Sequence, residues 1–408
     1  MKRNRGIALW AGVGMLCWAG VGTAQVTFKD DVEFLKTHNK DLVLLTDKSG
    51  QAQVAVAPQY QGKVMTSTAA GAAGVSFGWI NRETIASGQK QAHINVFGGE
   101  DRFWLGPEGG QFSIFFKKGD PFDFEHWQTP EAIDWGPWQV VDKESDSVSF
   151  RKDMQLANCS GTAFSLRVDR QIELLSPKAI GKVLDLDLGG KVKAVAFSST
   201  NTITNTGKEA WEKKGGLLSI WMLGMFNPGP QTTVVIPYLR GPAEKLGAVC
   251  NDMYFGKVPA ERLVDKDGVL YFRADGQYRS KIGISPLRVK DVAGSYDAQN
   301  GVLTIVRYTL PKYVFDYVNS TWQIQEKPFA GDVVNSYNDG PVAPGAKPLG
   351  PFYEIETSSP AAALKPGKSL THVHTTIHMQ GAEADLNVVA LSVFGVDLAT
   401  IKGVFAGK

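Results

Sequence analysis

The chain has 408 residues, of which 43% are hydrophobic and 10% aromatic, so it is long and apolar enough to bury a large core. Its 43 Lys and Arg residues nearly balance 41 Asp and Glu residues, which gives a formal net charge of +2. This balance argues against a nucleic-acid-binding protein, because such a protein needs a concentrated basic face.

Residues 1–24 have the pattern of a cleaved signal peptide. Basic residues at the start precede the apolar stretch "GIALWAGVGMLCWAGVG", and the small residues Gly22 and Ala24 suit a signal peptidase. Cleavage before Gln25 removes three basic residues and no acidic ones, so 40 basic residues face 41 acidic ones and the net charge becomes −1. We therefore expect a signal peptide at 1–24 and an exported protein, periplasmic or secreted, without a stable membrane span.

The alternatives for the N-terminus are a membrane anchor and a lipoprotein modified at Cys17. The apolar run is short and rich in glycine for a membrane span, and "GML" before Cys17 matches a lipobox poorly. In the mature chain, Cys159 and Cys250 could form a disulfide in an oxidising compartment or remain two buried thiols. Both alternatives stay open, because the sequence gives no distance between the two cysteines.

Helical patterns are scarce and lie at the two ends of the mature chain, at 30–40 and at the end of 386–405. Between them, β-branched and aromatic runs alternate with period two and are separated by Gly, Pro, Asn and Asp. The Asn-Gly pair in "YDAQNGVLTI" predicts a hairpin, and the Pro- and Gly-rich residues 338–351 predict a long surface loop over a binding face. We predict one all-β domain, residues 25–408, of large antiparallel sheets with few short helices.

Charged and aromatic residues gather on the turn "GGEDRFWLGPEGG" at 98–110. Glu100, Arg102, Trp104 and Glu108 combine a flat indole with carboxylates and a guanidinium. Such a set suits a sugar, because the ring stacks on C–H groups while the charged groups hydrogen-bond hydroxyls. Paired glycines also let the backbone approach a ligand. The alternative is a solvated corner with an internal Asp–Arg pair and a tryptophan packed in the core.

An aromatic loop follows this turn directly, in "GDPFDFEHWQTPEAIDWGPW" at 119–138. His126 and Trp127 are candidate ligand-binding residues, and His126 could act as an acid or base because its pKa lies near neutral pH. The alternative is a hydrophobic staple that holds a long loop down. Further along the chain, Arg279 and Lys281 share one strand face and suit sugar hydroxyls or a uronate carboxylate.

The sharpest pattern is "THVHTTIHM", in which His372 and His374 share one strand face. Glu354 and Glu356 follow the same spacing in "FYEIETS". If the two strands pair, two imidazoles and two carboxylates converge on one sheet surface. We predict these four residues as catalytic, and Arg102 and His374 should then face the same cavity. The alternatives are a solvent-facing polar sheet side and a divalent metal at His372 and His374; no other cofactor is expected.

Several segments resemble one known group of proteins. "VAPQYQGKVMTSTAAG" is similar to the opening strands of aldose 1-epimerases, and "GGEDRFWLGPEGG" to a turn of the galactose mutarotase superfamily. "YRSKIGISPLR", "GDVVNSYNDGP" and "GPFYEIETSSPAAALKPGKSLTHVHTTIHMQG" resemble a family of exported bacterial proteins of unknown function within it. The resemblance covers most of residues 50–380 and implies a supersandwich of two antiparallel sheets with a saccharide site on a concave face.

Two functions from different classes are compatible with these patterns. The first is an exported carbohydrate-active enzyme, an epimerase-like isomerase or a hydrolase or lyase on the same scaffold. The second is a non-catalytic glycan-binding protein, in which tryptophans bind and acids only orient hydroxyls. Both take a mono- or oligosaccharide ligand, and fold alone cannot choose between them.

Overall fold

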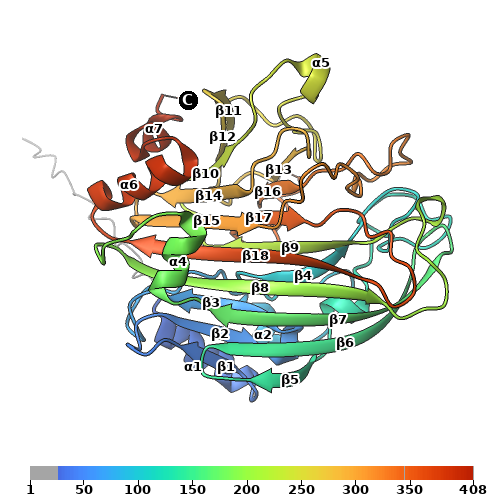
Figure 1. Cartoon of the computed structure of the whole chain (residues 1–408), viewed down its shortest axis with the longest axis horizontal. Helices are drawn as coiled ribbons and strands as arrows, with labels where there is room; N and C mark the ends of the chain where they lie inside the picture. The colour runs from blue at the N-terminus through green and yellow to red at the C-terminus, as the bar shows by residue number, and fades with distance from the viewer. Residues whose placement is uncertain (1–25, 344, 408) are drawn as a thin grey trace, which may run out of the picture.

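The computed structural model describes residues 26–343 and 345–407, which form three antiparallel sheets. The first sheet has ten strands, and Figure 1 shows them running across the molecule, from β5 at the bottom to β11 at the top. In spatial order they are β11 (Leu263–Lys266), β12 (Val269–Arg273), β10 (Thr232–Pro237), β14 (Val292–Asp297), β15 (Val302–Tyr308), β18 (Ser369–Gln380), β8 (Lys193–Asn205), β7 (Ala163–Leu174), β6 (Ser147–Ala157) and β5 (Gln139–Lys143).

The second and third sheets are smaller. The second sheet has five strands, in the order β13 (Ser280–Ile284), β16 (Val334–Asn338), β17 (Tyr353–Ser358), β9 (Ser219–Phe226) and β4 (Arg102–Gly106). The third sheet has three strands, β1 (Val43–Thr46), β2 (Gln53–Ala57) and β3 (Lys63–Thr68).

The main core lies between the first and second sheets. Because strand side chains alternate between faces, β4 and β9 direct Phe103, Ile220 and Met222 towards Phe150 and Phe197 of the first sheet. Burial of each such side chain contributes about 1.5–3 kcal/mol. The same alternation sends the other residues of β4 and β9 to the opposite face of the second sheet, away from the first.

Helices cover the remaining faces. On the outer face of the first sheet, α4, α6 and α7 pack against Ile305 and Ile377, and Figure 1 shows α4 lying across that sheet. On the third sheet, α1 packs against Ala55 and Met65. The helices are α1 (Phe28–His38), α2 (Arg82–Ser87), α3 (Glu131–Asp134), α4 (Pro177–Leu184), α5 (Ala243–Leu246), α6 (Glu383–Phe394) and α7 (Leu398–Gly403), with short 3-10 turns at Pro58–Tyr60 and Lys213–Gly215.

The expected all-β class, with large antiparallel sheets and few short helices, is confirmed. The terminal helices lie where the periodicity predicted them, and the Asn-Gly turn joins β14 to β15 as a hairpin. Cys159 and Cys250 are both free thiols, so the disulfide is not formed. The predicted signal peptide at 1–24 lies outside the described residues. Across residues 26–343 and 345–407, no helix has the length and apolarity needed to cross a membrane.

Candidate functional site

The outer face of the second sheet forms the floor of a pocket. Alternation along β4 and β9 brings Arg102, Trp104 and Trp221 to this face, and β17 and β13 bring Glu354 and Lys281. The register places these residues close together, since Trp104 pairs with Trp221 and Tyr337 pairs with both Glu354 and Lys281. Residues that are far apart in the sequence therefore share one floor.

Loops close the pocket from above. Glu108 follows β4, Phe124 and Trp127 come from the aromatic loop, and Trp322 comes from the segment before β16. The three aromatic rings form a row, with centroids 6.0 Å apart between Phe124 and Trp127 and 6.0 Å between Trp127 and Trp322. Together with the floor they surround about 680 Å³ of space free of protein atoms, part of it open to solvent. We call this space the site pocket.

Two ion pairs cross the floor. Arg102 Nη2 lies 2.8 Å from Glu354 Oε1, and the guanidinium lies 4.1 Å from the ring of Trp104. Lys281 Nζ lies 2.8 Å from Glu356 Oε2, which also accepts a hydrogen bond of 2.9 Å from Trp221 Nε1. All of these charged side chains are buried. Breaking one partner of such a pair costs more than the pair contributes, because the other charge is left without compensation.

Burial changes the protonation of the pocket carboxyls. It raises the pKa of Glu354, against the opposing charge of Arg102. It also raises the pKa of Glu108, against the opposing charge of Lys281. Burial would lower the pKa of Lys281, but Glu356 and Glu108 reverse that effect and raise it. The pocket therefore holds two carboxyl groups that can exchange protons closer to neutral pH than an ordinary glutamate.

Three residues that line the site pocket carry buried donors without a hydrogen-bond partner among the described residues. These donors are Arg102 Nε and Nη1, Trp104 Nε1 and Trp127 Nε1, all of them buried. A buried donor without a partner costs about 1–3 kcal/mol.

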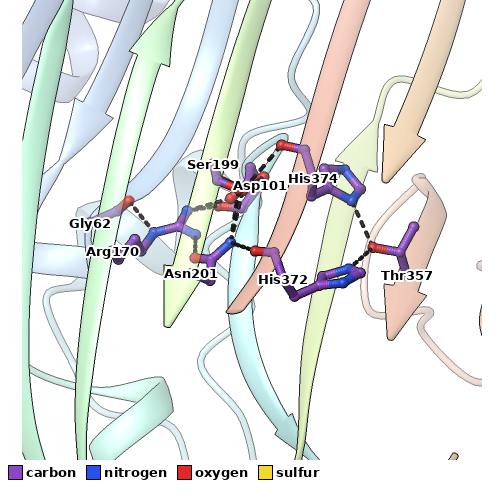
Figure 2. Close-up of polar contacts among 8 residues, drawn as sticks. All are labelled: Gly62, Asp101, Arg170, Ser199, Asn201, Thr357, His372 and His374. Atoms are coloured by element: carbon purple, nitrogen blue, oxygen red, sulfur yellow. Dashed lines mark hydrogen bonds and ion pairs between the residues drawn. The ribbon is translucent and has the colours of Figure 1, made fainter. Parts of the chain in front are cut away.

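The histidines lie on the other side of the second sheet. His372 and His374 are on β18 in the first sheet and face the core, where His372 Nε2 and His374 Nδ1 each lie 2.9 Å from Thr357 Oγ1 (Figure 2). Burial lowers the pKa of His372 to about 3 and also lowers the pKa of His374. Both rings are therefore neutral at physiological pH.

The expected convergence of the histidines with the glutamates is wrong. β17 pairs with β9 and β16, whereas β18 pairs with β8 and β15 in the first sheet. On β17 the side chain that faces the histidines is Thr357, and Glu354 and Glu356 point the opposite way. Arg102 lines the site pocket and His374 does not, so the two residues do not share a cavity. A period-two pattern defines the faces of a strand but not the sheet to which the strand belongs.

The turn at 98–110 is divided between two environments. Glu100 points inward, where it accepts hydrogen bonds from Ser67 and lies 2.9 Å from His378 Nε2. Gly98 and Gly99, with φ of 87° and 108°, bend the chain before β4, and a side chain at Gly99 would lie 2.8 Å from Val64 O. Glu100 therefore belongs to the core, whereas Arg102, Trp104 and Glu108 line the site pocket.

The remaining predicted residues lie as follows. Trp127, Arg279 and Lys281 line the site pocket, and the guanidinium of Arg279 lies 3.7 Å from the ring of Phe255. His126 is partly exposed and does not line the pocket; its Nδ1 lies 2.6 Å from Asp123 Oδ1. Within residues 26–343 and 345–407, no three His, Cys, Asp or Glu side chains are grouped so as to hold a metal ion. The divalent metal considered for His372 and His374 stays a prediction.

A family model matches residues 26–405, nearly the whole described chain. The chain belongs to a family of unknown function, DUF6786. No curated protein matches it.

Distant likenesses to solved structures concern the fold alone. A galactose mutarotase-like protein from Lactobacillus casei is 11% identical over 83% of this chain and 100% of its own, with a TM-score of 0.46. A galactose mutarotase related enzyme from Lactobacillus acidophilus is 10% identical over 83% and 97%, with a TM-score of 0.45. A protein from Synechocystis is 14% identical over 83% and 95%, with a TM-score of 0.49.

Sequence reasoning missed a large part of the pocket lining of this DUF6786 member. Trp221, Leu223 and Met225 lie on β9, in "SIWMLGMF", where every second residue faces the pocket. The run is apolar on both faces, so its composition is that of a fully buried strand. Trp322 and Phe255 lie in loops without a recognisable pattern. Only the tryptophan at an alternating position of β9 could have indicated a binding face.

Proposed function

We propose that the site pocket binds a saccharide. The observation that carries this proposal is the joint lining by Trp104, Trp127, Trp221 and Trp322 beside the Arg102–Glu354 ion pair. Indole faces stack on the C–H groups of a sugar ring, and charged side chains such as these hydrogen-bond sugar hydroxyls. The sequence resemblance to the galactose mutarotase superfamily agrees with this ligand class.

We further propose that the pocket interconverts the anomers of a reducing sugar. One carboxylate takes the proton of the anomeric hydroxyl while a protonated carboxyl gives a proton to the ring oxygen. The bond from the anomeric carbon to the ring oxygen then breaks and an open-chain aldehyde forms. Closure on the other face reverses both proton transfers. Glu354 and Glu108 suit these two roles because burial raises the pKa of each towards neutral pH.

A second candidate is non-catalytic glycan binding. Phe124 and Phe255 line the pocket although 56% and 41% of their surfaces are exposed, which favours a stacking rim. The floor charges also occur as mutual pairs, Arg102 with Glu354 and Lys281 with Glu356. Such pairs can orient hydroxyl groups without any proton transfer.

The test follows anomer ratios by NMR with a panel of reducing sugars. The protein should accelerate equilibration of at least one sugar, and Glu354→Gln should lower the rate by about 10²–10⁴-fold, the range for losing a general acid or base. Trp104→Ala should weaken binding, whereas Glu173→Gln, at an exposed position on β7, should change neither. Binding without acceleration would leave the glycan-binding candidate. Absence of both binding and acceleration would refute the proposal.

We also propose that the protein is exported, on the strength of the basic and apolar pattern of residues 1–24. Intact-mass measurement of protein recovered from the periplasm or medium should give a chain that begins near Gln25. A mass that includes residues 1–24, or a lipid on Cys17, would contradict this proposal.

A further inference from the structure

A second hollow continues from the site pocket along the same surface. The two share four lining residues, Ile94, Val96, Phe124 and Leu349. The second hollow surrounds about 1450 Å³ free of protein atoms, including open solvent, compared with about 680 Å³ in the site pocket. We call the second hollow the extension. Because the two spaces share these four residues, they adjoin each other, and together we call them the groove.

The junction between the two spaces is apolar and accessible. Phe124 lies in the aromatic loop at 119–138, and Leu349 lies in the segment between β16 and β17. Both residues line both spaces, and 56% and 43% of their surfaces are exposed. His93 supports Phe124, with ring centroids 4.8 Å apart, and is itself fixed by a contact of 2.7 Å between its Nδ1 and the carbonyl oxygen of Trp127. The loop that carries Trp127 in the site pocket therefore also shapes the extension.

The lining of the extension combines an aromatic surface with polar groups, as the lining of the site pocket does. Trp79 supplies an aromatic surface and packs 4.8 Å from Phe352, which lines the site pocket. Gln91 and Ser87 supply exposed amide and hydroxyl groups. The charged residues of the extension, Glu83 and Lys347, lie 3.1 Å apart and so compensate each other. An aromatic wall with neutral polar groups suits an uncharged sugar unit.

We propose that the ligand of this groove is an oligosaccharide of at least two units, with one unit in the site pocket and the next, an uncharged unit, in the extension. The chain of the ligand passes between Phe124 and Leu349. This inference rests on the proposed saccharide site, and it adds the length and charge of the ligand.

The experiment compares matched ligands by titration calorimetry. The probes are glucose, maltose, maltotriose, cellobiose, cellotriose, galactose and galactobiose. Maltose and cellobiose are compared with glucose, and galactobiose is compared with galactose. At least one of these disaccharides should bind at least ten-fold more tightly than its monosaccharide. Ala92→Trp narrows the extension without touching the site pocket, and it should remove this gain while leaving monosaccharide affinity unchanged. Ala163→Trp, at an exposed position on β7, is the matched control and should change neither.

The outcomes separate the two proposals. If monosaccharides bind and no disaccharide binds more tightly, the extension is not a subsite and the saccharide site stands. If Ala92→Trp leaves the gain unchanged, the second unit lies elsewhere and this inference fails. If none of the probes binds, the inference and the saccharide site fail together.

Discussion

At the scale of single residues, polar side chains of similar appearance in the sequence have opposite roles. Glu100 and Glu354 are both buried glutamates, yet Glu100 contacts His378 in the core and Glu354 lines the site pocket beside Arg102. The sequence predicted Arg102, Trp104 and Glu108 as neighbours because they lie on one short turn. It could not predict that two glycines with positive φ would turn Glu100 inward. That outcome depends on a close approach to Val64 from another strand.

His372 should make the protein less stable in acid. Its folded-state pKa is about 3, because burial lowers it, whereas an unfolded histidine has a pKa of about 6.5. Between these values the unfolded chain binds a proton that the folded chain does not. Stability is therefore complete above pH ~6.5 and falls as the pH drops towards 3, by about 1.4 kcal/mol per pH unit for this one group. His372→Gln should reduce the pH dependence of urea unfolding between pH 6.5 and 4.5 by that amount.

His126 provides the control for this measurement. The hydrogen bond that His126 donates to the Asp123 carboxylate raises the pKa of His126. Its contribution to stability therefore has the opposite sign: it is present at low pH and is lost as the pH rises through the folded-state pKa. His126→Gln should not reduce the loss of unfolding free energy between pH 6.5 and 4.5. An equal effect of both substitutions would show that His372 is not neutral in the folded protein.

At the scale of elements, alternation along each strand was predictable and the pairing of strands was not. The spacing of Glu354 and Glu356 correctly indicated that they share one face, and so did the spacing of His372 and His374. Their strands nevertheless lie in different sheets, because the segment between β17 and β18 crosses from the second sheet to the first. Register between β18 and β8 depends on residues far apart in the chain, which a local pattern does not contain.

Thr357 ties β17 to β18 across the core. Its hydroxyl contacts both His372 and His374, each at 2.9 Å. Thr357→Val keeps the shape of the side chain but leaves two buried ring nitrogens without a partner, so it should lower the free energy of unfolding by about 1–3 kcal/mol. Thr357→Ser keeps the hydroxyl group, so its free energy of unfolding should fall by less than that of Thr357→Val. Urea unfolding of both variants measures the difference, and equal losses would mean that the hydrogen bonds do not stabilise β17.

At the scale of the whole molecule, one buried network joins all three sheets. Arg170 of β7 donates from Nε to Gly62 O, just before β3, at 3.1 Å and from Nη1 to Asn201 Oδ1 at 2.5 Å (Figure 2). Arg170 also binds the Asp101 carboxylate just before β4, and Asp101 accepts a hydrogen bond of 2.8 Å from Ser199. Asp101 is followed directly by Arg102, so the network that joins the sheets also positions the first residue of the site floor.

Arg170→Leu should therefore destabilise the whole protein. The side chains of Arg170 and Asp101 are fully buried, and removing one partner of a buried pair costs about 3–5 kcal/mol. Arg151→Leu on the neighbouring strand is the matched control, because Arg151 pairs with Asp169 at 2.7 Å while 46% of its side chain is exposed. An exposed pair contributes at most about 1 kcal/mol, so this variant should unfold almost like the parent in urea.

A double-mutant cycle decides whether the pair itself carries the effect of Arg170→Leu. Asp101→Asn keeps the hydrogen bond from Ser199 in place but removes the charge that Arg170 compensates. If the charge pair couples β4 to β7, the double variant should lose less stability than the sum of the two single variants. Strict additivity, or a loss in Arg170→Leu no larger than in Arg151→Leu, would mean that the sheets are joined by apolar packing alone.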